Sequence, residues 1–459
     1  MKQVVVIGGG ISGLAAAHFA RKTANVTLIE RSNRLGGCIE TRRNDDFVLE
    51  MGADSLATEK PAATQLACSL GLELQPIHDE YRGTCILRNG RLVRMPDEFR
   101  LFTPTSLRAL VTSGLFSPAG ILRAALEPFV PPRRDTADES LASFVTRRFG
   151  REVLERLAQP LLGGIYSGDP ATLSVAATMP QLHDIERKYG SLVRGMRAII
   201  KQTPPGARLV SIRGGLGMLV SALERELHDR IRTGVGVTQL QRRGRGWELT
   251  LSDGTRTFAD AVICALPAHA AAELLQSVEP RLASRLLAIN YNSIATVTMA
   301  YKLGEVPPLP NSTGFVVPSI EHRPLMATTF SSRKYADRAP FGYMTLRAFI
   351  GGRNGQAQVS SDDKSLGALV KREFRDILGI TAEPAFVAVR RFLGALPEYS
   401  VGHREDVDRI EHLAQSLGNF ALAGSAYRGV GIADCIRSGE LAVRSLHHED
   451  THARAAIVR

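Results

Sequence analysis

Three spaced glycines near the start of the chain could carry a dinucleotide. Residues 4–13 read VVVIGGGISG, an apolar run followed by Gly8, Gly10 and Gly13. This pattern predicts a buried parallel strand, a tight turn and a helix whose first N–H groups point at a pyrophosphate. Glu30 then ends the strand-like run VTLIE. A carboxylate at that position can accept hydrogen bonds from both hydroxyls of a ribose.

The residues after Glu30 distinguish flavin from nicotinamide. The run RSNRLGG places Arg34, Gly36 and Gly37 directly behind the acid. This E-x-x-x-R-x-G-G pattern resembles the flavoproteins with two dinucleotide-binding domains, such as amine oxidases and phytoene desaturases. In that class the arginine and the glycine pair extend the cradle along the pyrophosphate of FAD. The alternative interpretation of this run is a basic surface loop with a turn. We expect it to bind FAD.

Chain length and net charge limit the number of domains and the classes of partner. The chain has 459 residues, 44 % apolar and 22 % charged, which is typical of two or three globular domains. The net charge of +11 favours anionic partners such as a polycarboxylate substrate or acidic lipid. No nucleic-acid motif accompanies the scattered basic residues, so we expect no nucleic-acid partner.

Cysteine usage and hydropathy indicate a cytoplasmic protein. The five cysteines form no C-x-x-C pair, so we expect neither a disulfide framework nor a metal site. The first strand begins at residue 4, which leaves no room for a signal peptide before it. No run reaches the roughly 18 apolar residues of a spanning helix.

The elements that must position these residues follow from periodicity. A helix opened by RGGLG at 213–217 places an apolar face at i, i+3, i+4 spacing, and strand patterns follow to residue 266. Residues 285–395 alternate strand-like runs with a helix near 363–378, which predicts a second, antiparallel sheet. After a strand ending at Gly424, a final helix starts near Gly431. The small residues there would let the main chain approach a flat ring.

Two segments narrow the family. GIYSGDPATLSVAATMP (164–180) and YRGVGIADCI (427–436) resemble signature segments of the oxygen-dependent protoporphyrinogen oxidases, whose fold the bacterial coproporphyrinogen III oxidases share. The resemblance spans the whole chain. The segment Gly52–Ser55 resembles the family's stretch beside the isoalloxazine, although Ala53 replaces a proline and Leu56 an aromatic residue.

The resemblance implies an α/β fold with three parts. A Rossmann-like FAD-binding domain would comprise residues 1–55, 205–270 and 400–459. A substrate domain with a mixed or antiparallel sheet would comprise 56–94 and 271–399. A helical, membrane-associated domain would comprise 95–204.

The resemblance also implies the chemistry. A porphyrinogen would lose six electrons to become a porphyrin of heme biosynthesis, and O₂ would accept them and leave as hydrogen peroxide. Protoporphyrinogen IX is the first choice of substrate and coproporphyrinogen III a close second. An amine oxidase, a carotenoid desaturase and an FAD-bearing carrier without turnover are the rivals. A homodimer and a peripheral contact with the inner face of the cell membrane are left open.

The candidate site follows from motifs and resemblance together. No side chain is expected to act as a catalytic acid or base, because the cofactor carries the hydride chemistry. Arg100, with Arg94 as a competitor, is the candidate anchor for a substrate carboxylate. Val317 and Met326 are candidate substrate contacts, with the sheet core as the alternative. The FAD-binding candidates are Gly8, Gly9, Gly10, Ile11, Ser12, Gly13, Glu30, Arg31, Arg34, Gly36, Gly37, Gly52, Ala53, Asp54, Ser55, Val237, Gly424, Val430, Gly431 and Ile432.

Residues 107–132 are the candidate membrane contact. The segment is rich in apolar residues, but Arg108, Pro118, Arg123 and Glu127 interrupt it. Short helices lying at an interface, with basic residues meeting acidic headgroups, fit this pattern. We expect the residues LF at 115–116 and I at 121 to face the lipid. The alternative is a helical subdomain that covers the substrate pocket or a dimer contact.

Overall fold

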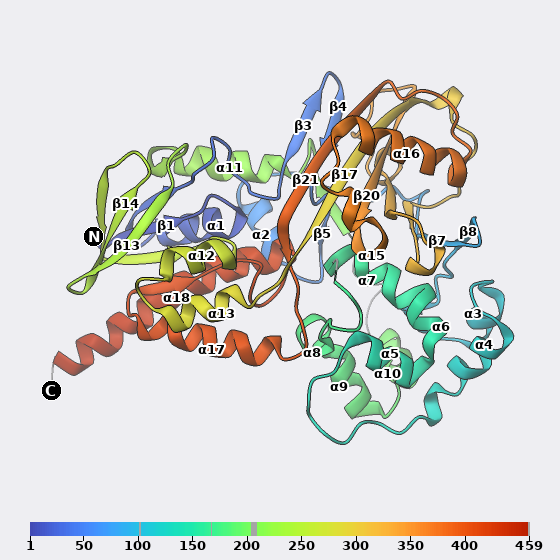
Figure 1. Cartoon of the computed structure of the whole chain (residues 1–459), viewed down its shortest axis with the longest axis horizontal. Coiled ribbons are helices and arrows are strands. Elements are labelled where there is room, and N and C mark those ends of the chain that lie inside the picture. Colours follow the sequence, from blue (N-terminus) through green and yellow to red (C-terminus); the bar gives the residue numbers. More distant parts are fainter. Residues whose placement is uncertain (101, 167, 203–208, 458–459) are drawn as a thin grey trace.

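One parallel sheet collects strands from three distant parts of the chain (Figure 1). The computed structural model describes residues 1–100, 102–166, 168–202 and 209–457. The strand order in this sheet is β12-β2-β1-β16-β22, and all neighbouring strands are parallel. The strands are β1 (Gln3–Ile7), β2 (Asn25–Ile29), β12 (Ile231–Arg232), β16 (Ala261–Cys264) and β22 (Phe420–Leu422).

Two layers cover this sheet. Val4 and Val6 of β1 pack into one layer, and Val5 and Ile7 into the other, because successive side chains of a strand point to opposite faces. The first layer holds α1 (Ile11–Ala20), α2 (Ala62–Ser69), α11 (Gly217–Leu227) and α18 (Ile432–Ile457). The second holds α12 (Ala268–Leu275), α13 (Pro280–Leu287), α17 (His403–Ser416) and the antiparallel strands β13 (Val237–Arg243), β14 (Gly246–Leu251) and β15 (Arg256–Ala259).

The chain stays with this unit longer than the predicted boundary after residue 55. β5 (Leu56–Ala57) and β6 (Leu74–Pro76) both pair with β11 (Leu209–Ile212). Leu66 of α2 lies in the same core as α1. The helix α13 and most of α12 fall in the predicted substrate segment 271–399, yet both helices pack on the parallel sheet. Short amphipathic elements do not reveal from sequence which sheet they will cover.

A second sheet of seven strands forms the other large unit (Figure 1). Its order is β21-β17-β20-β19-β18-β7-β8, and all neighbours are antiparallel except β18 and β7. The helix α16 (Asp363–Leu378) covers one face, as the periodicity predicted. The strands are β7 (Cys85–Arg88), β8 (Arg91–Arg94), β17 (Tyr291–Lys302), β18 (Gly314–Val316), β19 (Leu325–Phe330), β20 (Tyr343–Gly351) and β21 (Phe386–Pro397).

Short elements connect the two sheets and their edges. The hairpin of β3 (Thr41–Asn44) and β4 (Phe47–Glu50) lies between the sheets (Figure 1). The remaining short elements are β9 (Phe99–Arg100), β10 (Thr103–Pro104), α14 (Ser331–Lys334) and α15 (Gly352–Gly355).

Helices between residues 107 and 202 form a third unit with its own apolar core. They are α3 (Leu107–Thr112), α4 (Pro118–Ala125), α5 (Leu141–Phe149), α6 (Arg151–Val153), α7 (Gln159–Tyr166), α8 (Val175–Thr178), α9 (Pro180–Tyr189) and α10 (Leu192–Gln202), with a π-helical turn at Leu154–Ala158. Within the described ranges, no helix combines the length and apolarity needed to cross a membrane.

The segment 107–132 divides between core and surface differently from the prediction. Leu115 and Phe116 are 0 % and 5 % exposed and pack inside the helical unit, and Ile121 packs against the same core. These three side chains therefore do not form an outer contact face. A different set of five apolar residues is exposed on α3, α4 and the turn that follows α4. They are Leu107, Val111, Leu122, Leu126 and Phe129.

Two charged side chains in this segment bind groups of the protein itself. Arg123 donates to the carbonyls of Arg147 (2.7 Å) and Arg148 (3.1 Å), and so satisfies free acceptors at the end of α5. Glu127 is fully buried and pairs with the guanidinium of Arg148. The expected contact of Arg123 with lipid headgroups is therefore not supported, whereas Arg108 is exposed.

Candidate functional site

The glycine turn between β1 and α1 is sterically closed on its inner side. Gly8 has a φ of +106°, and its N–H donates to the carbonyl of Ile29 at 2.8 Å. A Cβ on Gly8 would lie 2.8 Å from the oxygen of Ala265, and one on Gly13 would lie 1.9 Å from the oxygen of Gly8. Glycine is required at both positions, because β1, α1 and the end of β16 approach one another so closely.

The outer side of the same turn is open main chain. A Cβ on Gly10 would meet no atom within 4 Å, and one on Gly37 would lie 3.2 Å from the Gly10 Cα. The N–H of Gly36 donates to the carbonyl of Gly9 at 2.8 Å and holds the second glycine pair beside the first. In the described structure α1 has neither a side-chain cap nor an acid in its first turn. This cradle and the uncapped helix N-terminus fit the pyrophosphate of FAD.

Glu30 follows β2, and its carboxylate already holds the turn. Its Oε2 accepts the N–H of Gly9 at 2.7 Å, and its Oε1 accepts the N–H and the hydroxyl of Ser32, each at 2.8 Å. The two Ser32 donors fill the lone pairs of Oε1, whereas Oε2 has a further lone pair that can accept a ribose hydroxyl. The geometry fits the ribose-binding role that the sequence predicted.

Arg34 shapes the loop from within. It donates to the carbonyls of Leu35 and Ile39, both at 2.9 Å, and thereby surrounds the turn at Gly36 and Gly37. In this structure its guanidinium donates to main-chain carbonyls of its own loop. A direct contact of Arg34 with the pyrophosphate stays a prediction.

Arg31 and Val237 border the same end of the cradle. Arg31 is exposed, and a Cβ on Gly236 would lie 3.2 Å from its Cγ. The N–H of Val235 donates to the carbonyl of Glu30 at 3.2 Å. The start of β13, with Val237, therefore lies beside the ribose-binding acid, and its role as a cofactor contact stays a prediction.

The C-terminal loop returns the chain to α1. The helix α18 crosses α1 so closely that a Cβ on Gly439 would lie 2.3 Å from the carbonyl oxygen of Ser12. The N–H of Gly424 donates to Ser438 at 3.0 Å, which ties β22 to α18. Burial raises the pKa of the Cys435 thiol to about 12, and Ser12 is its hydrogen-bond partner. That thiol packs between the helices, which fits a flavin held without a covalent bond.

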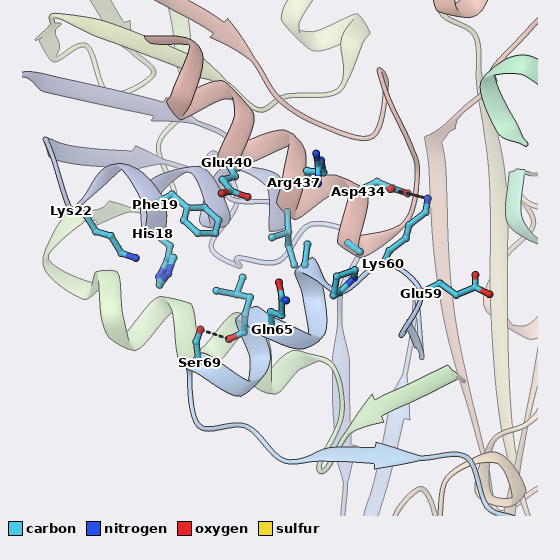
Figure 2. Close-up of a pocket in the computed structure, with 15 residues that line it drawn as sticks. His18, Phe19, Lys22, Glu59, Lys60, Gln65, Ser69, Asp434, Arg437 and Glu440 are labelled. Atoms are coloured by element: carbon cyan, nitrogen blue, oxygen red, sulfur yellow. Dashed lines mark hydrogen bonds and ion pairs between the residues drawn. The ribbon is translucent and has the colours of Figure 1, made fainter. Parts of the chain in front are cut away.

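An ion pair occupies the first turn of α18. Both oxygens of Asp434 accept the ammonium of Lys60 at 2.8 Å, and Oδ2 lies 3.3 Å from the N–H of Gly431. Figure 2 shows this pair beside a pocket of about 570 Å³ between α1, α2 and α18. His18 in the last turn of α1 and Lys22 just beyond that helix line the pocket, so it lies away from the glycine turn. The positive end of α18 thus carries an acid whose charge Lys60 offsets.

The segment Gly52–Ser55 is held by the second sheet. Asp54 accepts Lys334 at 2.9 Å and Arg347 at 2.7 Å. Burial alone would raise the pKa of Asp54, but these two cations outweigh it and hold the pKa well below its usual range. The side chain of Asp54 is therefore a structural anion. Cofactor contacts by Ala53 and Asp54 stay predictions.

Two further contacts lock this segment. A Cβ on Gly52 would lie 2.0 Å from the oxygen of Cys38, so the segment packs tightly against the loop after Gly37. The hydroxyl of Ser55 contacts that of Tyr335 at 2.7 Å. Placement of the flavin ring beside Gly52–Ser55 stays a prediction.

Sequence reasoning missed Tyr399, which lies just beyond β21. Its hydroxyl accepts the N–H of Gly429 at 2.8 Å and donates to the carbonyl of Ser425 at 2.6 Å. Its main-chain carbonyl accepts the N–H of Ser174 at 2.8 Å. One residue therefore joins the two segments that carry the family resemblance. No spacing or composition signal marks it, because its partners are distant in sequence.

Three units meet near the start of α18. Val430 packs against the core of the helical unit, where Tyr166 of α7 and Val316 of β18 also pack. Ile432 packs instead into the core beside α1. The loop between β22 and α18 thus lies where the cofactor, helical and second-sheet units converge.

The three predicted substrate contacts have different outcomes. The side chain of Arg100 lies outside the described residues, although its main chain pairs in β9. Val317 is 4 % exposed and packs under α16, so its position supports the sheet-core alternative, whereas Val316 faces the helical unit. Met326 is half-buried, and a Cβ on Gly163 of α7 would lie 3.9 Å from its methyl group. Met326 therefore lies where the second sheet meets the helical unit.

The fold and the cradle define a flavoprotein oxidoreductase with a Rossmann-like cofactor unit and a second, sheet-based unit. The family model for flavin-containing amine oxidoreductases matches residues 11–447, and the chain belongs to this family. Its cofactor is FAD, as the glycine turn and the arginine–glycine loop predicted.

Individual relatives are similar over the full length. The chain is 34 % identical to the coproporphyrinogen III oxidase of Bacillus subtilis (strain 168), covering 96 % of this chain and 97 % of that one. It is 27 % identical to protoporphyrinogen oxidase 2, chloroplastic/mitochondrial, of Arabidopsis thaliana, covering 95 % and 92 %. The crystal structure of a candidate protoporphyrinogen oxidase from Exiguobacterium sp. 255-15 superimposes with a TM-score of 0.88 at 32 % identity, covering 98 % and 99 %.

Proposed function

We propose that this protein oxidises coproporphyrinogen III to coproporphyrin III in heme biosynthesis. The observation that carries the proposal is the end-to-end similarity to the coproporphyrinogen III oxidase of Bacillus subtilis. Protoporphyrinogen IX, which the sequence motifs placed first, is the alternative, and the similarity to the Arabidopsis thaliana enzyme supports it. The net charge of +11 favours the substrate with four carboxylates over the one with two.

The protein's part in this reaction is binding and placement. Bound FAD would accept two electrons at a time with O₂ as the final acceptor, so six electrons need three rounds. The main chain of Gly8–Gly13 and Gly36–Gly37 would hold the pyrophosphate, and Glu30 the ribose. The macrocycle would lie where the helical unit meets the second sheet and the loop before α18, and apolar walls there would exclude water from the reacting carbon.

A direct comparison of substrates tests the proposal. Purified holoenzyme is mixed with coproporphyrinogen III or protoporphyrinogen IX, and porphyrin fluorescence and peroxide are followed together. We expect a higher kcat/KM for coproporphyrinogen III and one peroxide for each pair of electrons removed. Preference for protoporphyrinogen IX would select the alternative substrate. Turnover of amines alone would overturn the porphyrinogen proposal.

Arg100 remains the proposed anchor of one substrate carboxylate. Arg94, its competitor, is exposed and lies 3.9 Å from Asp97. In the same assay, Arg100→Ala should raise KM more than it lowers kcat, because a remote carboxylate contact stabilises ground and transition states alike. The loss should be about 1–3 kcal/mol. An effect of Arg94→Ala in place of Arg100→Ala would move the anchor to Arg94.

A membrane surface is the second proposed partner. The exposed residues Leu107, Val111, Leu122, Leu126 and Phe129 lie on α3, α4 and the following turn, at one edge of the molecule in Figure 1. Arg108 of α3 is also exposed and adds a positive charge to the same helix. Apolar side chains beside a basic residue suit shallow insertion among acidic headgroups. A cytoplasmic location with peripheral attachment follows from this proposal, and a homodimer stays a prediction.

A further inference from the structure

The hydroxyl of Tyr399 spans the loop that precedes α18. It donates to the carbonyl of Ser425 at 2.6 Å and accepts the N–H of Gly429 at 2.8 Å, so it bridges two main-chain groups of one loop. The Tyr399 side chain is 1 % exposed. Both main-chain groups would be left without this partner if the hydroxyl were removed, and an unpaired buried polar group is costly.

The loop has little freedom at the point where Tyr399 holds it. Gly429 has a φ of +150°, and a Cβ there would lie 2.4 Å from the carboxyl carbon of Asp434. Val430 and Gly431, the predicted flavin contacts, follow directly. A shift of the Gly429 N–H would therefore move the main chain that faces the proposed ring.

Tyr399 is itself held from two sides. The ring of His403 stacks on it with a centroid distance of 4.0 Å and an interplanar angle of 15°. The imidazole Nε2 lies 3.1 Å from the carbonyl of Tyr427, so it donates to the same loop. The main-chain carbonyl of Tyr399 accepts Ser174, and the N–H of Val401 donates to Thr172 at 2.9 Å. These contacts fix the phenol against both α17 and the helical unit.

We propose that Tyr399 is a positioning residue for the flavin: its hydroxyl fixes the Ser425–Gly431 loop and so sets the placement of the main chain at Val430 and Gly431 against the isoalloxazine. This inference rests on the proposed placement of the ring beside that loop. The main chain at Tyr399 also binds the 172–174 segment of the helical unit. The helical unit is thereby connected to the Ser425–Gly431 loop through one residue, by the main chain of Tyr399 on one side and its hydroxyl on the other.

The test compares two phenol deletions in the same neighbourhood. Tyr399→Phe removes the bridging hydroxyl. Tyr427→Phe removes a buried hydroxyl that has no hydrogen-bond partner among the described residues. Each variant is purified as holoenzyme, stripped of FAD and titrated with it. The visible circular dichroism of the bound flavin and its midpoint potential are then measured.

We expect Tyr399→Phe to weaken FAD binding by about tenfold and to change the flavin spectrum and potential. Tyr427→Phe should match the unmodified protein in all three. Equal effects of both variants, or a lower thermal stability of Tyr399→Phe with an unchanged flavin, would overturn the proposal. These readouts need no porphyrinogen, so failure of the substrate proposal would be seen separately.

A measurement on the unmodified holoenzyme covers the case in which Tyr399→Phe does not fold. Hydrogen exchange of the Gly429 amide should be at least tenfold slower than in an unstructured chain, because the buried phenol accepts it. Exchange at the unstructured rate would show that the bridge does not exist in solution, and the proposal would fall.

Discussion

At the residue scale, the carboxylate of Glu30 has two roles in the cradle, one toward the protein and one toward the cofactor. It accepts the N–H of Gly9 and so supports the glycine turn, and its Oε2 keeps a lone pair for the ribose. Glu30→Ala should weaken FAD binding by about 2–4 kcal/mol, because charge-assisted hydrogen bonds are lost. Fluorescence titration of the apoprotein with FAD measures this.

Ser32→Ala is the matched control for that variant. It removes the hydroxyl that donates to Oε1 at 2.8 Å and leaves the carboxylate in place. We expect a change below about 1 kcal/mol. Equal affinity of Glu30→Ala and the unmodified protein for FAD would mean that another group holds the ribose.

Individual residues of the site differ in how well their contacts could be predicted from sequence. Gly8 and Gly13 were predictable because the steric demand of a strand–turn–helix is local. Asp54 was predicted as a cofactor contact, yet its side chain is bound to Lys334, 280 residues away. For Val317, sequence left open a substrate contact or the sheet core, because its face of the sheet depends on the register of β18. Such partners follow from the fold and not from spacing.

At the element scale, a buried carboxylate fastens the helices of the third unit. Glu127 is 0 % exposed and accepts the N–H of Leu192 at 2.8 Å and the hydroxyl of Ser191 at 2.6 Å, at the start of α10. It also accepts Nε of Arg148 in α5 at 2.8 Å. One side chain therefore caps a helix and neutralises a buried cation.

Glu127→Ala should destabilise the protein by about 3–5 kcal/mol, because Arg148 would be left buried without its partner. Chemical denaturation, followed by circular dichroism, measures the change. The control is Glu155→Ala, which breaks the exposed pair with Arg151 on neighbouring turns and should cost less than about 0.5 kcal/mol. Similar costs for the two variants would contradict the role assigned to Glu127.

Elements themselves were more predictable than their assignment to units. Periodicity located the helix α16 and strand-like runs within residues 285–395 of the second sheet, because each buries a continuous apolar face. It did not single out β7 and β8 of the same sheet. It could not show that α2 and the strand at Leu56 join the core beside α1. Nor could it show that Glu127, in an apolar stretch, is a buried cap. Both outcomes depend on contacts across long stretches of chain.

At the scale of the whole molecule, three units converge on one loop and leave the helical unit with a free outer edge. Figure 1 shows α3 and α4 at that edge, away from the parallel sheet. The apolar residues on this face are large: Leu122 is 64 % exposed and Phe129 is 77 % exposed. This exposed edge is the part of the helical unit on which the proposed membrane contact depends.

Flotation with anionic vesicles tests this arrangement. The holoenzyme should float at low salt and less at high salt, because screening weakens the attraction of Arg108 to acidic headgroups. The double variant Leu122→Ser and Phe129→Ser should stay at the bottom of the gradient, since it removes the most exposed apolar area of the face.

Phe341→Ser is the control: Phe341 is 105 % exposed in the turn before β20, outside the helical unit. If the double variant floats like the control, α4 and its following turn do not contact the membrane. If the unmodified protein does not float at low salt, the peripheral attachment itself is wrong.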